Sequence, residues 1–295
     1  MPIPIFAFST GNKADLASNK YVAGTTLTYY WSQLQPKNAP PDFSAIDRDM
    51  APWIAAKKRV ILRVATSGWK SWQPPYSQQG TPQWVFDQGV RKVKETDGAI
   101  KPEYWASKFL SNLNAFIVAF AARYGNNANV AMIEIGIGDG GETKPDTRFK
   151  GNANILKAWK GIGYDDKTWW ATIQTIALQY KTAFTSTPLA IMPDNSFIGG
   201  TKGYGESLVL GFAAAHGFVL QNNGLVNGEI LKDPSWKHTK IIDEQRDKLA
   251  QGTSTLAQLL ATAINDGAMC ALMFAVDLAE PKNQATLAQF ATVAA

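Results

Sequence analysis

Cysteine and histidine are almost missing from this chain of 295 residues. The one cysteine, Cys270, lies in the apolar run 268–274, and the two histidines are His216 and His238. A single cysteine cannot form an intramolecular disulfide, and these three side chains are too few for a typical Cys/His zinc site. We therefore expect Cys270 to be a small buried hydrophobe and both histidines to be structural.

Long apolar runs and clusters of one charge are missing too. No stretch of about 18 apolar residues occurs, so we expect no transmembrane helix and no membrane partner. The net charge is +5, but the basic residues are spread along the chain, and we expect a solvated surface and no nucleic-acid partner. The start, MPIPIF, lacks the charged and apolar regions of a signal peptide. We expect a secreted monomer whose signal peptide is not part of this sequence, with a cytoplasmic location as the alternative.

The chain does contain a regular alternation of strand-like and helix-like segments, and its 45% of hydrophobic residues can build one large core. A small hairpin is predicted at 90–101, with its turn at Asp97-Gly98. Eight strand-like segments, with helix-like segments between most of them, predict the α/β class and a single (β/α)8 TIM barrel over residues 1–295. The strand-like segments are 3–8, 25–31, 59–65, the start of 130–143, 189–192, 218–221, 238–242 and 269–276.

The stretch 130–143 carries the clearest pattern. Strand parity puts Met132, Glu134 and two glycines on one face, and three isoleucines on the other. In a parallel barrel the isoleucines would pack against helices, while the glycines would leave space near the axis. Glu134 is too deep in the strand to reach a substrate, and Arg63 has the matching parity, so we expect the two to form a buried pair.

Polar residues follow the predicted strands, at the end of the barrel where such folds do their chemistry. Glu142 and Glu244 stand out, because each is the acid just past a strand, the fourth and the seventh. Two carboxylates across a barrel mouth can hydrolyse an acetal: one protonates the leaving oxygen, and the other attacks the anomeric carbon or activates a water. The other polar residues at this mouth are Asp139, Asp194, Asn195, Asn222 and Asp277.

These segments resemble the large glycoside hydrolase superfamily of (β/α)8 barrels, in particular its β-galactosidase-like and cellulase-like branches. The likeness rests on YWSQLQP (30–36) after strand two, VILRVA (60–65) with TPQW (81–84), GGE (140–142) and DE (243–244), and it covers nearly the whole chain. The resemblance implies that Glu142 is the general acid/base, that Glu244 is the nucleophile, and that the configuration is retained.

Two positions depart from the family pattern. The family usually has an Asn before the acid/base, where this chain has Gly141. Many members end strand six with a Tyr beside the nucleophile, where this chain offers Gln221 and Asn222. We therefore expect the substrate site to differ from the family pattern at these two positions.

Aromatic side chains near the strand ends are candidates for stacking on a sugar, because an aromatic ring presents apolar area to the C–H face of a pyranose. Trp31, Trp69 and Trp84 are the strongest of these, with core packing as the alternative for each. Asp139 could bond a sugar hydroxyl or stabilise its own turn.

The sequence therefore predicts a retaining glycoside hydrolase that cleaves β-glycosidic bonds in a polysaccharide or oligosaccharide and needs no metal or organic cofactor. A barrel that binds carbohydrate without cleaving it is one alternative. A metal-dependent enzyme with Asp194, Asp277 and Glu244 as oxygen ligands is another.

Overall fold

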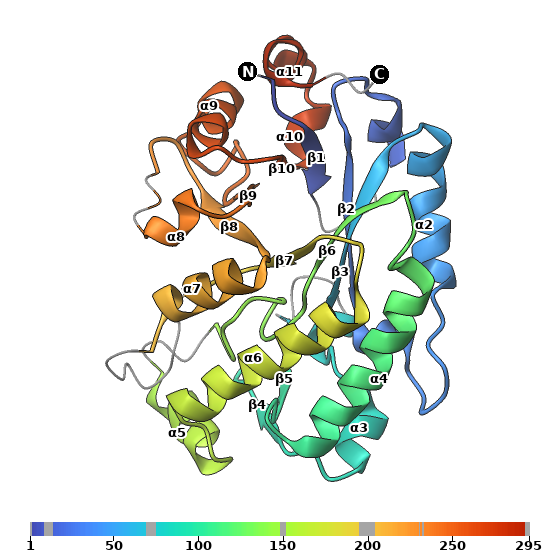
Figure 1. Ribbon diagram of the computed structural model, residues 1–295, viewed down its shortest axis with the longest axis vertical. Helices are drawn as coiled ribbons and strands as arrows, with labels where there is room; N and C mark the ends of the chain where they lie inside the picture. The colour runs from blue at the N-terminus through green and yellow to red at the C-terminus, as the bar shows by residue number, and fades with distance from the viewer. Residues whose placement is uncertain are drawn as a thin grey trace.

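Eight parallel strands close into a barrel, with helices around it (Figure 1). The structure is a computed structural model and describes residues 2–8, 14–68, 75–147, 152–194, 204–229, 231 and 233–292. The barrel strands follow one another around the ring, and the first pairs with the last, which confirms the predicted (β/α)8 fold. In chain order they are β1 (Ile5–Phe8), β2 (Gly24–Tyr30), β3 (Arg59–Ala65), β6 (Val130–Glu134), β7 (Leu189–Ile191), β8 (Val219–Leu225), β9 (Ile241–Gln245) and β10 (Ala271–Phe274).

Local signals in the sequence set where the outer helices begin. The Asp165 side chain accepts a hydrogen bond from the Thr168 N–H at the start of α6, and Thr255 and Gln258 form a capping box at the start of α9. The α-helices are α1 (Trp31–Leu34), α2 (Ser44–Ala55), α3 (Gln83–Asp87), α4 (Ser107–Tyr124), α5 (Ala153–Gly161), α6 (Asp166–Ala183), α7 (Glu206–His216), α8 (Pro234–Lys237), α9 (Leu256–Asp266), α10 (Ala275–Ala279) and α11 (Gln284–Phe290). Short 3₁₀ turns are η1 (Ala14–Ser18), η2 (Tyr76–Gln78) and η3 (Pro281–Asn283).

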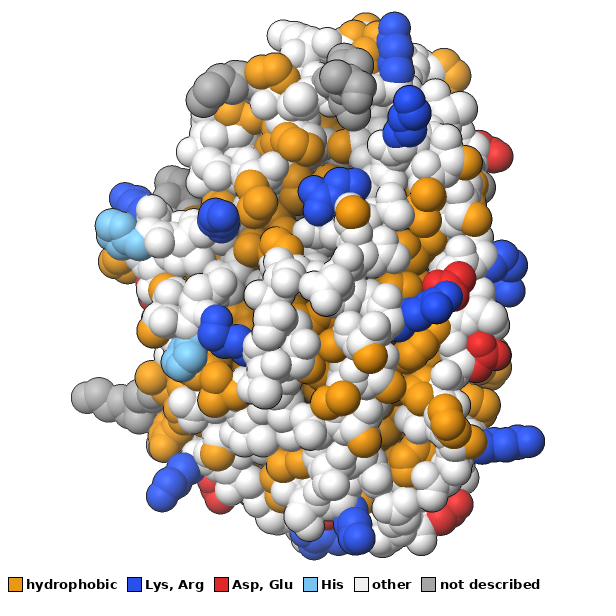
Figure 2. All heavy atoms as spheres, turned by 45° about the vertical axis from the view of Figure 1, so that its right-hand side comes forward, with side chains coloured by type: hydrophobic (Ala, Val, Ile, Leu, Met, Phe, Trp, Pro, Cys, Tyr) orange, Lys and Arg blue, Asp and Glu red, His pale blue; other side chains and the backbone are white. Residues whose placement is uncertain are grey.

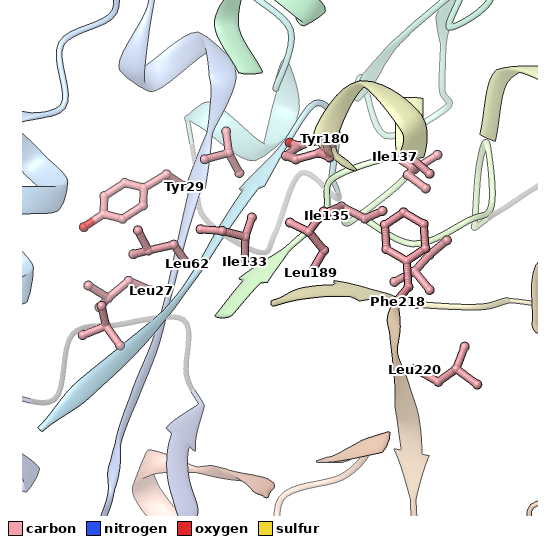
Figure 3. Packing of buried hydrophobic residues seen from close by; sticks show 14 of the residues in the cluster. Leu27, Tyr29, Leu62, Ile133, Ile135, Ile137, Tyr180, Leu189, Phe218 and Leu220 are labelled. Atoms are coloured by element: carbon pink, nitrogen blue, oxygen red, sulfur yellow. The ribbon is translucent and has the colours of Figure 1, made fainter. Parts of the chain in front are cut away.

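Two apolar layers hold the barrel together. The outer layer fills the space between strands and helices, and Figure 3 shows Ile133, Ile135 and Leu189 beside Tyr180 of α6. Burying this layer is the main source of stability in a fold of this kind. The inner layer fills the barrel axis with Phe6, Phe8, Ile61, Met132, Ala190, Val219, Ile242, Cys270 and Leu272. The predicted parity of β6 and the burial of Cys270 are confirmed.

Gly136 does not have the role that the sequence suggested. A Cβ there would lie 1.9 Å from the carbonyl oxygen of Val64 on β3. The glycine therefore lets the backbone of the neighbouring strand approach closely, instead of leaving open space near the axis.

Two strands at the mouth run further than predicted. β8 continues past the expected end at residue 221 to Leu225, and β9 starts at Ile241 and includes Glu244. Polar residues that were expected to follow these strands are hydrogen-bonded within the sheet. Asn222 donates to Asp243 at 3.1 Å, and the Gln245 side chain accepts a hydrogen bond from the Phe274 N–H at 2.9 Å. After β9 the chain forms turns and bends as far as Leu256, where α9 begins.

The remaining features frame the barrel. The predicted hairpin is confirmed as β4 (Lys92–Lys94) paired with β5 (Ile100–Pro102). Both chain ends lie near α11, where Ile3 and Ala291 form a parallel bridge (Figure 1). On the face shown in Figure 2, Lys and Arg side chains are scattered among apolar and neutral atoms. Within the described ranges, every helix is too short or too polar to cross a bilayer.

Candidate active site

A cavity of about 190 Å³ lies at the C-terminal ends of the barrel strands, and both Glu142 and Glu244 line it. The two acids come from the loop after β6 and from β9, which are about a hundred residues apart in the sequence. The structure therefore brings together the pair that the sequence singled out. The other lining residues are Phe8, Thr28, Tyr30, Arg63, Gly68, Gly140, Asn223, Gln245, Arg246 and Phe274.

Glu244 points into the barrel because it shares the parity of Ile242, an inner-layer residue of the same strand. Its Oε2 accepts hydrogen bonds from Arg63 Nη2 at 2.9 Å and from Gln221 Nε2 at 3.0 Å. Burial raises the pKa of Glu244 to about 7, while the Arg63 guanidinium opposes that rise and Glu134 adds to it. Glu244 is thus held by one cation and one amide, from β3 and β8.

Arg63 forms the expected buried ion pair with Glu134, in which its Nε donates to Glu134 Oε2. The guanidinium also reaches Glu244, which the sequence did not indicate. Because a guanidinium carries donors in a rigid fork, one side chain can fix both carboxylates. Glu134 therefore acts on Glu244 through Arg63 and keeps that arginine in place.

Glu142 has a different set of partners. Its Oε1 accepts a hydrogen bond from Asn223 Nδ2 at 3.1 Å, and its Oε2 pairs with the ammonium of Lys144. Lys144 Nζ is also 3.1 Å from Asp194 Oδ2, in the loop after β7. Burial raises the pKa of Glu142, and Lys144 opposes that rise. Sequence reasoning missed Asn223, although it shares strand parity with Gln221, because β8 was expected to end two residues earlier.

Gly141 stands where the superfamily that this sequence resembles usually has an asparagine, and its backbone conformation suits glycine. Gly141 has a φ of +94°, and a Cβ there would lie 2.9 Å from Met192 Cε. A branched polar side chain would be strained at this φ and crowded by Met192. The amide beside Glu142 comes instead from Asn223 on β8.

Three of the other predicted site residues lie beside the cavity or away from it. Gln221 contacts Glu244 directly. Asn222 lies on the opposite face of β8, where it donates to Asp243 at 3.1 Å and to Glu229 at 2.9 Å. Asp277, in α10, accepts from Gln245 Nε2 at 2.8 Å and from the Leu249 N–H at 3.0 Å. Asp277 thus holds the segment after β9, and the expected contact of Asp277 with substrate is not supported.

Asp139 is fully buried and belongs to a separate charged cluster. It pairs with Lys101 of the hairpin and accepts from Thr147 N at 3.0 Å and Thr147 Oγ1 at 2.7 Å. Asp139 therefore stabilises its own loop, the alternative considered from the sequence, and does not face a sugar. Glu95, Asp139 and Asp146 lie close enough to share a metal ion, but the Lys101 ammonium already pairs with Glu95 and Asp139.

The hypothesis of a metal site formed by Asp194, Asp277 and Glu244 is wrong. Asp277 is bonded to Gln245 and Leu249, Asp194 to Lys144, and Glu244 to Arg63 and Gln221. Among the described residues these three acids do not form a group with metal-ligand spacing.

Trp31 and Trp84, the candidate tryptophans that the structure describes, pack in the hydrophobic core. Trp31 is 0% exposed and packs edge-on against Trp84 at 5.9 Å between ring centroids, so it offers no face to a ligand. Trp84 Nε1 donates to the Gln35 carbonyl oxygen at 3.0 Å. Trp69 and Asn195 lie outside the described residues. The aromatic side chains that line the cavity are Phe8, Tyr30 and Phe274.

Further hollows continue from this cavity. One of about 290 Å³ shares Glu142 and Asn223 with it and is also lined by Lys144, Asp194 and Trp236. The next, of about 480 Å³, shares Trp236 and extends along α7 and the segment after β8. A chain-like ligand could therefore continue outward from Glu142.

Comparison with protein-family models and with curated protein sequences finds no match. Among solved structures, the catalytic domain of the β-amylase from Paenibacillus polymyxa has a TM-score of 0.66 at 10% identity, over 99% of this chain and 95% of that one. A β-galactosidase from the psychrophilic Marinomonas ef1 has a TM-score of 0.55 at 11% identity, over 92% and 54%. An intracellular xylanase from Thermoanaerobacterium saccharolyticum has a TM-score of 0.52 at 14% identity, over 92% and 85%. At these identities the likeness establishes a shared fold.

Proposed function

We propose that the chain is a glycoside hydrolase that cleaves β-glycosidic bonds in an oligosaccharide or polysaccharide with retention of configuration. The observation that carries the proposal is the placement of Glu142 and Glu244 on one cavity at the C-terminal mouth of the barrel, each with its own polar partners. The solved structures that share the barrel include a β-amylase, a β-galactosidase and a xylanase, which supports the hydrolysis of glycosidic bonds.

In the proposed reaction Glu244 is the nucleophile and Glu142 is the general acid/base. The family resemblance assigns Glu244 as the nucleophile, and its bonds to Arg63 and Gln221 hold the carboxyl group in one orientation on a barrel strand. In the first step a Glu244 oxygen bonds to the anomeric carbon, the glycosidic C–O bond breaks, and Glu142 gives its proton to the leaving oxygen. In the second step Glu142 takes a proton from water, whose oxygen displaces Glu244 from the anomeric carbon.

The shape of the site favours a substrate longer than one sugar. Phe8, Tyr30 and Phe274 give the central cavity apolar area for a sugar ring, and the hollows beyond Glu142 could hold the leaving-group side of a chain. Acid, base and nucleophile are all supplied by side chains, so the proposed reaction requires no cofactor.

A barrel that binds carbohydrate without cleaving it is the second candidate. Lys144 favours it, because its pairing with Glu142 stabilises the ionised form of a residue that must carry a proton to act as an acid. Gly141, in place of the family's asparagine, also points this way.

A substrate screen with rescue of the variants tests the proposal. The chain is assayed on a panel of 4-nitrophenyl β-glycosides and β-linked polysaccharides, and NMR identifies the anomer that forms first. We expect Glu142→Ala and Glu244→Ala to lose at least about a hundredfold in kcat, within the range that general acid–base catalysis contributes. Azide should restore turnover in both, giving a β-glycosyl azide with Glu142→Ala and an α-glycosyl azide with Glu244→Ala. Glu280→Gln, at an exposed glutamate, is the matched control.

The outcome separates the two candidates. Equal activity of Glu244→Ala and the wild type would remove the nucleophile assignment. Binding of a glycan by the wild type, with no reducing ends released across the panel, would favour the non-hydrolytic barrel.

A further inference from the structure

Lys144 holds a position between two carboxylates at the edge of the candidate active site. It lies two residues after Glu142, its side chain is 9% exposed, and its ammonium pairs with Glu142 Oε2 and lies 3.1 Å from Asp194 Oδ2. A buried lysine is costly unless it is paired, and here both partners are acids. One of them is the proposed acid/base and the other has no part in the proposed chemistry.

The hydrogen bonds of Glu142 suit a carboxylate better than a carboxylic acid. Both of its oxygens receive donors, Asn223 Nδ2 on Oε1 and Lys144 Nζ on Oε2. A protonated carboxyl must use one oxygen as an O–H donor, and a general acid must direct that O–H at the leaving oxygen. When Glu142 carries its proton, the negative charge that attracts the Lys144 ammonium to Oε2 is gone, and the Asp194 carboxylate becomes its stronger partner.

Asp194 is placed to receive the ammonium at that moment. Its backbone N–H donates to Thr143 Oγ1 at 2.8 Å, and the Thr143 N–H donates to the Met192 carbonyl oxygen at 3.0 Å. These bonds lock the loop after β7 to the loop that carries Glu142. Lys144 can then shift between the two acids by a side-chain movement, with both backbones fixed.

We propose that Lys144 is a positioning residue that pairs with Glu142 while that carboxyl is ionised and turns to Asp194 when Glu142 takes up a proton. The inference rests on the proposed function, in which Glu142 donates a proton in one step and accepts one in the next. Lys144 stabilises the carboxylate left after the first step, and Asp194 keeps the ammonium charged and close by throughout.

Other charges face Glu142 from the surrounding elements. Glu244 on β9 lies across the cavity and is compensated by Arg63 on β3. Arg246 follows β9 and lines the same cavity, and Glu206 of α7 lines the adjoining one with Asp194. Among the described residues, Lys144 is the cation in an ion pair with Glu142, so its removal should change Glu142 more than any other acid of the site.

The experiment titrates Glu142 directly. The protein is labelled with glutamate carrying ¹³C in the side-chain carboxyl, and the Glu142 signal is assigned by its loss in Glu142→Gln. In Lys144→Met the midpoint of this signal should move up by about one to three pH units, because an opposite charge at contact distance is lost. Lys144→Arg should restore it. Asp194→Asn should lower it, because a negative charge near Glu142 is removed and no longer competes for the Lys144 ammonium.

Kinetics on a substrate from the screen test the link to the reaction. In Lys144→Met the alkaline limb of the kcat/KM profile should follow the ¹³C midpoint upward. Asp194→Asn should lose more kcat on a phenyl glycoside than on the 2,4-dinitrophenyl glycoside of the same sugar, since only the phenyl leaving group needs the acid.

The failures are distinguishable. An unmoved Glu142 midpoint in Lys144→Met overturns the inference about Lys144, whatever the protein cleaves. If the midpoint moves in Lys144→Met but the wild-type protein cleaves no glycoside, the proposed function is overturned, and with it any catalytic part for Lys144. The ion pair between Lys144 and Glu142 would still be established.

Discussion

At the scale of single residues, the two glutamates differ through what surrounds them. Glu244 is bonded to Arg63 and Gln221, from two barrel strands, whereas Glu142 is bonded to Asn223 and to a lysine of its own loop. Strands hold side chains more rigidly than loops do. In the proposed reaction, the nucleophile Glu244 therefore lies on a strand, and the acid/base Glu142 lies on a loop.

Glu244→Gln should remove activity and at the same time raise stability at alkaline pH. The pKa of Glu244 is about 7 in the folded protein and about 4.3 in an unfolded chain. The folded state therefore holds the proton more tightly between these values, and the contribution of this carboxyl to stability falls as the pH rises through that window. A glutamine never ionises, so the variant avoids this loss.

Urea unfolding at pH 5 and pH 8 measures the effect. We expect the stability of Glu244→Gln relative to the wild type to be about 1–3 kcal/mol higher at pH 8 than at pH 5. Glu280→Gln, on the surface, should show no such difference. A variant that gains nothing at pH 8 would mean that Arg63 fully offsets the burial of Glu244.

The sequence predicted the acids of the site better than their partners. An acid just past a strand is visible in the sequence, because parallel strands all end at one face of the barrel. The contact between Lys144 and Asp194 depends on how two loops meet, and no local pattern carries that information. The role of Trp31 could not be read either, since a tryptophan near a strand end suits a core and a sugar equally well.

At the scale of elements, the hairpin β4–β5 is fastened to the barrel by a buried charge. Lys101 is 0% exposed, pairs with Glu95 at 3.3 Å and with Asp139, and donates to the Gly68 carbonyl oxygen at 3.0 Å. Asp139 lies in the loop that leads to Glu142. One lysine thus connects the hairpin, the loop after β3 and the loop after β6.

Lys101→Met should destabilise the fold strongly, because it leaves the buried Asp139 carboxylate without its cation. Removing one partner of a buried ion pair costs about 3–5 kcal/mol. Lys94→Met is the matched control, since Lys94 is exposed on the same hairpin, and it should change stability by less than about 0.5 kcal/mol. Urea unfolding at pH 7 measures both. Equal midpoints for the two variants would show that the hairpin does not depend on the buried charge.

Element boundaries were predictable where apolar pattern and caps agreed. β3 begins and ends at the predicted residues, because its apolar run is bounded by clear changes of composition. β8 and β9 end later than predicted because their last residues are polar. The side chains of these residues form hydrogen bonds across the sheet, such as that between Asn222 and Asp243. This bond joins residues about twenty positions apart in the sequence, so the local hydrophobic periodicity does not reveal it.

At the scale of the whole molecule, the alternation of strands and helices was enough to predict a closed barrel. Closure needs no special residue, since eight parallel strands with right-handed crossovers return to the first strand. In the folded protein several carboxyl groups are buried. Burial raises the pKa of Glu95 to about 8, and those of Asp243 and Glu244 to about 7.

The stability of the whole protein should therefore fall as the pH rises from 5 to 8.5. Between the unfolded pKa of about 4 and the folded pKa of about 7 to 8, each of these carboxyls stays protonated in the folded state and is ionised in the unfolded state, so the folded state binds more protons and stability decreases with pH. Below about pH 4 the trend should reverse, because Lys101 and Thr147 hold the pKa of Asp139 below its usual range. Urea midpoints at half-unit steps of pH measure the curve, and we expect a loss of at least about 2 kcal/mol between pH 5 and 8.5.

Glu95→Gln should flatten the slope between pH 7 and 8.5, where Glu95 ionises. A wild-type stability that rises steadily from pH 5 to 8.5 would mean that these acids are ionised within the folded barrel, with Arg63 and Lys101 compensating their charge in full.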